Sequence, residues 1–128
     1  MKIIFFTLCD YATNEKGHLT IVNTRDLLEV EKLPWRAYLG FAIKGYFDKE
    51  YPQTTLTLSI YKAEQESQPI FKTTADIKQG VGKFQMAGNL RGLIFNEEGE
   101  YEFRIESNHG LKFKDSFKIE LSKPHNKS

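Results

Sequence analysis

The sequence predicts an all-β domain, an antiparallel sandwich of two sheets with about eight strands. Three observations support this prediction. Aromatic residues make up 13% of the chain, and rings suit a pleated, half-buried surface. Apolar and polar side chains alternate in several segments, which is the period of a strand with one buried face. Turn residues recur roughly every eight to twelve positions, a spacing typical of sandwiches and not of βαβ units.

The N-terminal third predicts a hairpin followed by a segment of undecided structure. Residues Lys2–Cys9 form a continuous apolar run, as expected of a strand covered on both faces. Polar turn residues fill Asp10–Gly17, and His18–Asn23 alternates as a second strand. Residues Thr24–Pro34 could form a strand, a loop or a short helix, and Pro34 indicates a bend.

The centre of the chain predicts two long strands. The first spans Arg36–Phe47 and is followed by a connecting loop, Asp48–Gln53. The second, Thr54–Lys62, has the most regular alternation in the chain, because every second residue is a large aliphatic one. We expect the following side chains of this strand to face the core: Leu56, Leu58 and Ile60.

The C-terminal half predicts four more strands. A weak strand covers Phe71–Ile77, and the next continues through Phe84, Met86 and Leu90. In the penultimate strand, apolar residues alternate with charged ones, and an Asn-His-Gly turn joins it to a last strand, Leu111–Leu121. The expected inward residues of the penultimate strand are Tyr101, Phe103 and Ile105.

Length and composition favour one domain, residues 1–122, with a flexible tail at 123–128. The single cysteine, Cys9, excludes an internal disulfide and favours a reducing compartment, so we expect a cytoplasmic protein. The apolar run at the N-terminus is shorter than the core of a signal peptide. No segment has the roughly 18 apolar residues of a membrane span, so no membrane partner is expected.

Charge and motif content argue against nucleic acid, cofactors and catalysis. Eighteen basic residues oppose seventeen acidic ones without a basic cluster, so no nucleic-acid partner is expected. The three histidines and Cys9 are too far apart in sequence for a local zinc site, and no phosphate loop occurs, so no cofactor is predicted. No nucleophile motif is present, and Glu100, Glu102 and Glu106 fit the solvated face of a strand. The chain is therefore not expected to be an enzyme.

The most unusual surface lies on the second face of the strand Arg36–Phe47. Small residues flanked by tyrosines would form a flat surface there, which another chain could approach closely. We favour the explanation that Thr24–Pro34 of the same chain covers this face. The alternative is an interface, because Tyr and Trp are enriched at binding hot spots. The candidate interaction surface consists of Trp35, Tyr38, Gly40, Ala42 and Tyr46.

The segment Leu93–Ile105 resembles the penultimate strand of immunoglobulin-like sandwiches. A turn ends at Gly99, and Tyr101 follows where such domains place a corner tyrosine that hydrogen-bonds back to the preceding connection. Phe103 stands where antibody domains have their second cysteine. The chain lacks the cysteine pair, and Trp35 precedes a strand instead of lying within one. The resemblance implies a sandwich and no antibody ancestry.

A second resemblance spans more of the chain. The opening strand with Cys9-Asp10-Tyr11-Ala12, the Pro-bounded crossing into Arg36–Phe47 and the near-terminal Gly99-Glu100-Tyr101-Glu102-Phe103 resemble a family of uncharacterised bacterial proteins of about 130 residues. That family implies a β-sandwich and assigns no activity.

A complete fold pattern without catalytic motifs favours a non-enzymatic binding or assembly domain that contacts a protein partner or a second copy of itself. One alternative is a carbohydrate-binding module in which Trp35, Tyr38, Tyr46 or Tyr51 stack on sugar rings. The other is an enzyme whose site is assembled from scattered residues, which requires a concave pocket with convergent titratable groups.

Overall fold

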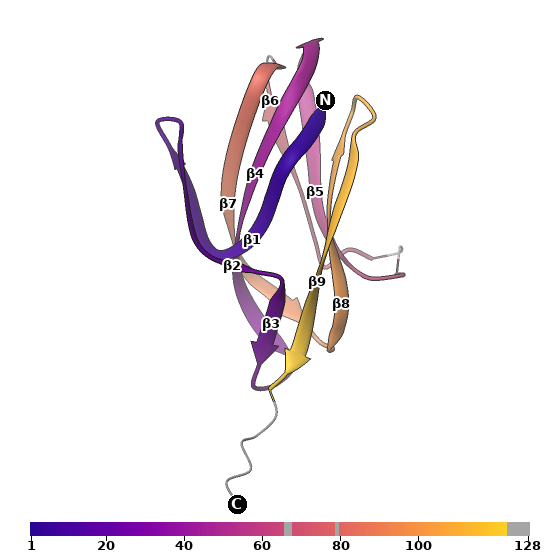
Figure 1. Cartoon of the computed structure of the whole chain (residues 1–128). Coiled ribbons are helices and arrows are strands. Elements are labelled where there is room, and N and C mark those ends of the chain that lie inside the picture. Colours follow the sequence, from indigo (N-terminus) through magenta and orange to yellow (C-terminus); the bar gives the residue numbers. More distant parts are fainter. Residues whose placement is uncertain (66–67, 79, 123–128) are drawn as a thin grey trace, which may run out of the picture.

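Two sheets make up the computed structural model, which describes residues 1–65, 68–78 and 80–122 (Figure 1). Sheet A has the strand order β2-β1-β4-β7, and sheet B has the order β3-β9-β8-β5-β6. The predicted all-β, two-sheet sandwich is confirmed, with nine strands in the described part of the chain. The expected flexible tail, 123–128, lies outside the described residues.

The strands match the predicted segments, and several are longer than predicted. Their bounds are β1 (Lys2–Glu15), β2 (His18–Arg25), β3 (Leu27–Val30), β4 (Trp35–Tyr51), β5 (Thr54–Lys62), β6 (Phe71–Ile77), β7 (Gly80–Phe95), β8 (Gly99–Ser107) and β9 (Lys112–Leu121).

The first hairpin is longer than the sequence suggested. Strand β1 continues through Asp10 to Glu15, so the predicted turn contracts to two residues, Lys16 and Gly17. Both have positive φ, 50° and 79°, as a tight hairpin turn requires. The connecting loop predicted at Asp48–Gln53 is likewise wrong over most of its length, because β4 extends to Tyr51 and pairs there with Gly80 of β7.

Residues Thr24–Pro34, left open by the sequence, contain the ninth strand. Strand β3 pairs in parallel with the end of β9, from Leu27 opposite Lys118 to Val30 opposite Leu121. It is the one departure from the predicted antiparallel arrangement among the described strands. The side chains of Leu28 and Val30 are buried in the main core, so this segment closes the lower end of the sandwich.

The core lies between the sheets and contains both predicted inward rows. The rows Leu56-Leu58-Ile60 and Tyr101-Phe103-Ile105 are buried. Phe103 of sheet B touches two rings of sheet A, with centroid distances of 4.7 Å to Phe6 and 5.4 Å to Phe41. Ring contacts of this kind join the two sheets and add to the free energy of burying apolar area.

Tyr101 makes the hydrogen bond that its resemblance to a corner tyrosine implied. Its hydroxyl donates to the carbonyl oxygen of Glu97 at 2.6 Å, four residues earlier in the chain. The ring is buried against Phe95 and Phe117, at centroid distances of 5.0 and 5.7 Å. One side chain thus anchors the β7–β8 connection to the core. None of the described residues belongs to a helix that could span a membrane.

We predict that Tyr101→Phe lowers the free energy of unfolding by about 1 kcal/mol, because the ring still fills its site while the Glu97 carbonyl loses its donor. Urea denaturation of the purified protein measures this difference. Tyr38→Phe is the matched control, since the Tyr38 side chain is exposed. Equal stability of the two variants would contradict the anchoring role.

Candidate functional site

The outer face of sheet B is a ladder of opposite charges. Two acidic residues of β8 stand opposite basic residues of β9, Glu100 opposite Lys118 and Glu106 opposite Lys112, while Arg104 stands opposite Lys114. Opposite charges directly across two strands stabilise the pairing, and like charges would weaken it. This face is therefore largely neutralised by its own side chains.

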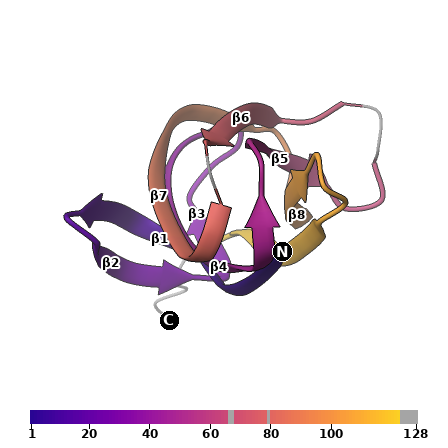
Figure 2. The same ribbon diagram turned by 90° about the horizontal axis from the view of Figure 1, so that it is seen from above.

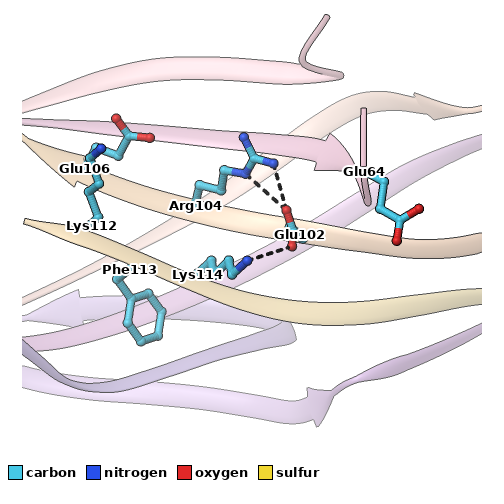
Figure 3. Close-up of a pocket in the computed structure, with 7 residues that line it drawn as sticks. All are labelled: Glu64, Glu102, Arg104, Glu106, Lys112, Phe113 and Lys114. Atoms are coloured by element: carbon cyan, nitrogen blue, oxygen red, sulfur yellow. Dashed lines mark hydrogen bonds and ion pairs between the residues drawn. The ribbon is translucent and has the colours of Figure 1, made fainter. Parts of the chain in front are cut away.

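At the middle of the ladder, Glu102 is held by two cations. The Arg104 guanidinium donates to Oε1 of Glu102 through Nη2 at 2.8 Å and Nε at 3.2 Å, and Lys114 Nζ lies 3.5 Å from Oε2 (Figure 3). The guanidinium also lies over the Tyr61 ring, 4.1 Å from its centroid. These hydrogen bonds, with that from Arg104 as the largest cause, lower the pKa of the Glu102 carboxyl, which stays ionised at neutral pH.

An open recess of about 490 Å³ lies over this cluster (Figure 3). Three carboxylates and three cations line it, together with one ring: Glu64, Glu102, Glu106, Arg104, Lys112, Lys114 and Phe113. Because Glu102 is already bound to two cations, it has neither a proton to give nor free basicity for proton abstraction. The recess has the convergent titratable groups that the enzyme alternative requires, and the carboxylate at its centre, Glu102, is held in ion pairs.

The outer face of sheet A differs in character. Lys2, Tyr46 and Lys83 stand opposite one another on β1, β4 and β7, and Phe5 and Lys44 form the next row. Side chains of directly opposed residues point to the same face. A bulge between Ile3 and Phe5 adds Ile4, which shares a shallow recess with Lys2, Tyr46 and Lys83. We call this the outer-face patch: Lys2, Ile4, Phe5, Lys44, Tyr46 and Lys83.

The outer-face patch combines exposed apolar groups with unpaired cations. The exposed fractions are 52% for Ile4, 39% for Phe5 and 43% for Tyr46. Within the described residues, no carboxylate lies at ion-pair distance from its three lysines. Asp48 lines the same recess, where it accepts from the N-terminal ammonium at 2.7 Å and from the Tyr51 hydroxyl at 2.8 Å. These contacts lower the pKa of Asp48 to about 2.

Below the outer-face patch, the β1–β2 hairpin folds over the same sheet. Its outer half leaves the body of the sandwich on the side of β7 (Figure 2). The bend begins near Asn23, whose φ of 52° interrupts the pairing opposite Asp10. A small second core results from Cys9, Ala12 and Ala42, with partly buried neighbours packed against it: Leu19, Ile21 and Ala87.

Asn89 of β7 fastens this hairpin. Its side chain accepts from Ala12 N at 3.0 Å and donates to Ala12 O at 2.7 Å, so it replaces a neighbouring strand. Gln85 binds the hairpin tip, donating to Asn14 Oδ1 at 2.9 Å and to Gly17 O at 2.6 Å. Gly40 lies beneath this contact, and a Cβ there would be 2.9 Å from Asn89 Oδ1. Only glycine allows so close an approach.

The predicted interaction surface is therefore divided. Gly40 and Ala42 are buried, and the segment expected to cover them, Thr24–Pro34, is the wrong one, because the β1–β2 hairpin does so. Tyr38 is 43% exposed below the hairpin, under the Arg91 guanidinium at 5.4 Å. Trp35 is half-buried and stacks on Phe95 at 5.8 Å. Tyr46 alone of the five joins the outer-face patch.

Sequence reasoning missed the other members of the outer-face patch. Lys2, Ile4 and Phe5 were assigned to a strand covered on both faces, and Lys83 precedes a weakly patterned segment. The outward position of Lys44 beside Tyr46 followed from alternation on one strand. The rows that join the three strands depend on the pairing of β1 and β7 with β4, which no local pattern specifies.

We predict that Asn89→Ala frees the hairpin, because the buried N–H and C=O of Ala12 lose their partners. The cost is about 2 kcal/mol of local stability. Hydrogen exchange would be faster at the Ala12 amide and unchanged in the β8–β9 pair. Asn96→Ala, at an exposed asparagine, is the control. Unaltered exchange at Ala12 in Asn89→Ala would contradict this role.

We predict that Glu102→Gln destabilises the protein most at neutral pH. Because the folded pKa of Glu102 is lowered, its contribution is full above the ordinary value of 4.5 and is lost as the pH falls through the folded pKa. The stability difference between wild type and variant, measured by urea denaturation, should therefore be constant above about pH 4.5 and narrow as the pH falls below it. A difference independent of pH would show that the carboxylate charge contributes nothing.

Comparisons with known proteins identify the family and no activity. No significant match occurs among proteins of curated function. Two crystal structures of a β-glucosidase from Listeria innocua, with glucose and without, superpose with a TM-score of 0.43 at 10% and 12% identity. They cover 91% and 93% of this chain, which spans only 16% of theirs. Similarity this low says nothing about the activity of the chain.

A family model matches residues 4–120, nearly the whole described chain. This finding confirms the expected relationship to an uncharacterised family. The chain belongs to a family of unknown function, DUF6941.

Proposed function

We propose that this protein is a non-enzymatic binding domain that contacts a protein partner through the outer-face patch. The observation that carries the proposal is the contrast between the two outer faces. On sheet B, Glu102 has ion-pair partners in Arg104 and Lys114, whereas the three lysines of the outer-face patch have no such partner among the described residues and surround exposed Ile4, Phe5 and Tyr46. Apolar and tyrosine side chains exposed together on a rigid sheet are typical of interfaces.

A heterologous partner fits this surface better than a second copy of the chain. A symmetric dimer buries the same patch of both subunits. The three lysines would then face their own copies without an intervening carboxylate, and such like-charge contacts oppose association. A different protein can instead supply complementary groups.

The carbohydrate-binding alternative requires a row of exposed rings, and the tyrosines that it names on β4 do not form one. Tyr38 and Tyr46 are eight positions apart on β4, with the buried Gly40 and Ala42 between them. At about 3.3 Å per residue their backbones are some 26 Å apart, too far for adjacent sugar units. Trp35 stacks on Phe95 within the fold.

We also propose an immunoglobulin-like relationship and a reducing compartment for this domain. The Tyr101–Glu97 hydrogen bond supports an immunoglobulin-like relationship. A reducing compartment such as the cytoplasm suits the free thiol of Cys9, whose pKa is raised by burial.

We predict that a photoreactive residue at position 46 cross-links one specific protein in cells that express the chain, and that the same residue at Thr57, on sheet B, does not. The cross-linked protein is then identified and purified. The dissociation constant of its complex with this chain should rise about tenfold when Tyr46 is changed to Ser. Tyr38→Ser is the matched control, because Tyr38 has the same exposed fraction on the same strand.

Equal binding of wild type and Tyr46→Ser by the purified protein would refute the proposal. Measuring the mass of the protein in solution tests whether the partner is a second copy of the chain. A dimer that becomes a monomer when Tyr46 is changed to Ser would show that it is. We expect a monomer.

A further inference from the structure

We infer that the partner of the outer-face patch is an acidic protein segment with an apolar anchor. This inference rests on the proposed function and adds the chemistry of the partner. The supporting observation is the distribution of charged residues over sheet A, which depends on the order of its strands.

Three neighbouring stretches of sheet A contain no acidic residue. Lys2–Cys9 of β1, Arg36–Phe47 of β4 and residues 83–94 of β7 lack Asp and Glu entirely, and their five basic residues all lie on the outer face. The whole chain has a formal charge of +1, so the remaining residues carry −4. The five cations are Lys2, Lys44, Lys83, Arg36 and Arg91.

The geometry of the outer-face patch fits an apolar side chain flanked by carboxylates. Lys2 and Lys83 stand on either side of Tyr46 in one row, two strand spacings or about 10 Å apart at the backbone. Ile4 and Tyr46 line the shallow recess between them, together with Met1 and Asp48, whose opposite charges form an ion pair. An apolar anchor can occupy that recess while carboxylates on both sides reach the lysines. This suits an extended protein segment with acidic residues two positions before and two positions after an apolar one, because such residues face the same side.

A nucleic acid fits the same charges less well. Single-stranded nucleic acid follows a continuous basic groove with rings along it. Here the hairpin, fastened by Asn89 at Ala12, lies over the middle of the face and separates Lys2, Lys44 and Lys83 from the arginines below. The exposed aliphatic side chain of Ile4 also has no role in contacting phosphates.

The test uses the full chain and fluorescein-labelled peptides of about 12 residues, a length that spans the patch in extended form. One peptide has Glu two positions before and after each Leu or Phe, with Ser at the positions between, a second has Lys for Glu, and a third has Ser for Leu and Phe. A single-stranded oligonucleotide is the fourth probe. We expect the acidic-apolar peptide to bind about tenfold more tightly than each of the others.

The salt dependence of peptide binding and the effects of lysine-to-glutamate variants then show where the peptide binds. Raising the salt from about 0.05 M to about 0.5 M should weaken binding about tenfold, because exposed charges are screened. Lys44→Glu should weaken it by a similar factor. Lys72→Glu makes the same charge change on exposed β6 of sheet B and should leave binding unaltered. Lys83→Gln, a milder change, serves if Lys44→Glu fails to fold.

Tighter binding of the oligonucleotide, or equal effects of Lys44→Glu and Lys72→Glu, would overturn the inference. So would a cross-linked partner that binds through Tyr46 with no dependence on salt or on Lys44, and that result would leave the proposed function intact. The absence of any partner dependent on Tyr46 would instead overturn the proposed function itself.

Discussion

The contact of the two sheets through Phe103 is the constraint on which the rest of the structure depends. Its ring is fully buried in sheet B and touches Phe6 of β1 and Phe41 of β4. Because alternate residues of a strand face opposite sides, fixing Phe6 and Phe41 inward turns Phe5 and Ala42 outward. The same ring contacts thus place Phe5 and Ala42 on the outer face of sheet A, whereas Ile4 reaches that face through the bulge between Ile3 and Phe5.

The outer faces of the two sheets both carry charged side chains, but these side chains are paired differently. On sheet B, Glu102 is bound by Arg104 and Lys114, so the charges neutralise one another. On sheet A, the lysines have no such partners among the described residues, and the hairpin held by Asn89 covers only the small residues between the two tyrosines. The two sheets therefore present different outer faces, one with paired charges and one with exposed apolar side chains between lysines.

Alternation along the chain was sufficient for the fold class and for part of the core. The rows Leu56-Leu58-Ile60 and Tyr101-Phe103-Ile105 face inward as predicted. In a strand with one solvent-exposed face, apolar residues at every second position indicate which face is buried. The role of Tyr101 was also readable, since its hydrogen-bond acceptor lies four residues away. Local chemistry of this kind needs no knowledge of distant strands.

The sequence by itself determined the all-β class, most of the strands and the inward rows of β5 and β8, and it contains no recognisable catalytic motif. Tertiary structure alone decided that the hairpin, and not Thr24–Pro34, covers Gly40 and Ala42, because Asn89 is 77 positions from the backbone it binds. It also decided that Lys2, Lys44 and Lys83 share one face. Each lysine stands alone in its own segment, and only the order β1-β4-β7 places them together. Alternation specifies which way a side chain points, and strand pairing specifies which side chains become its neighbours.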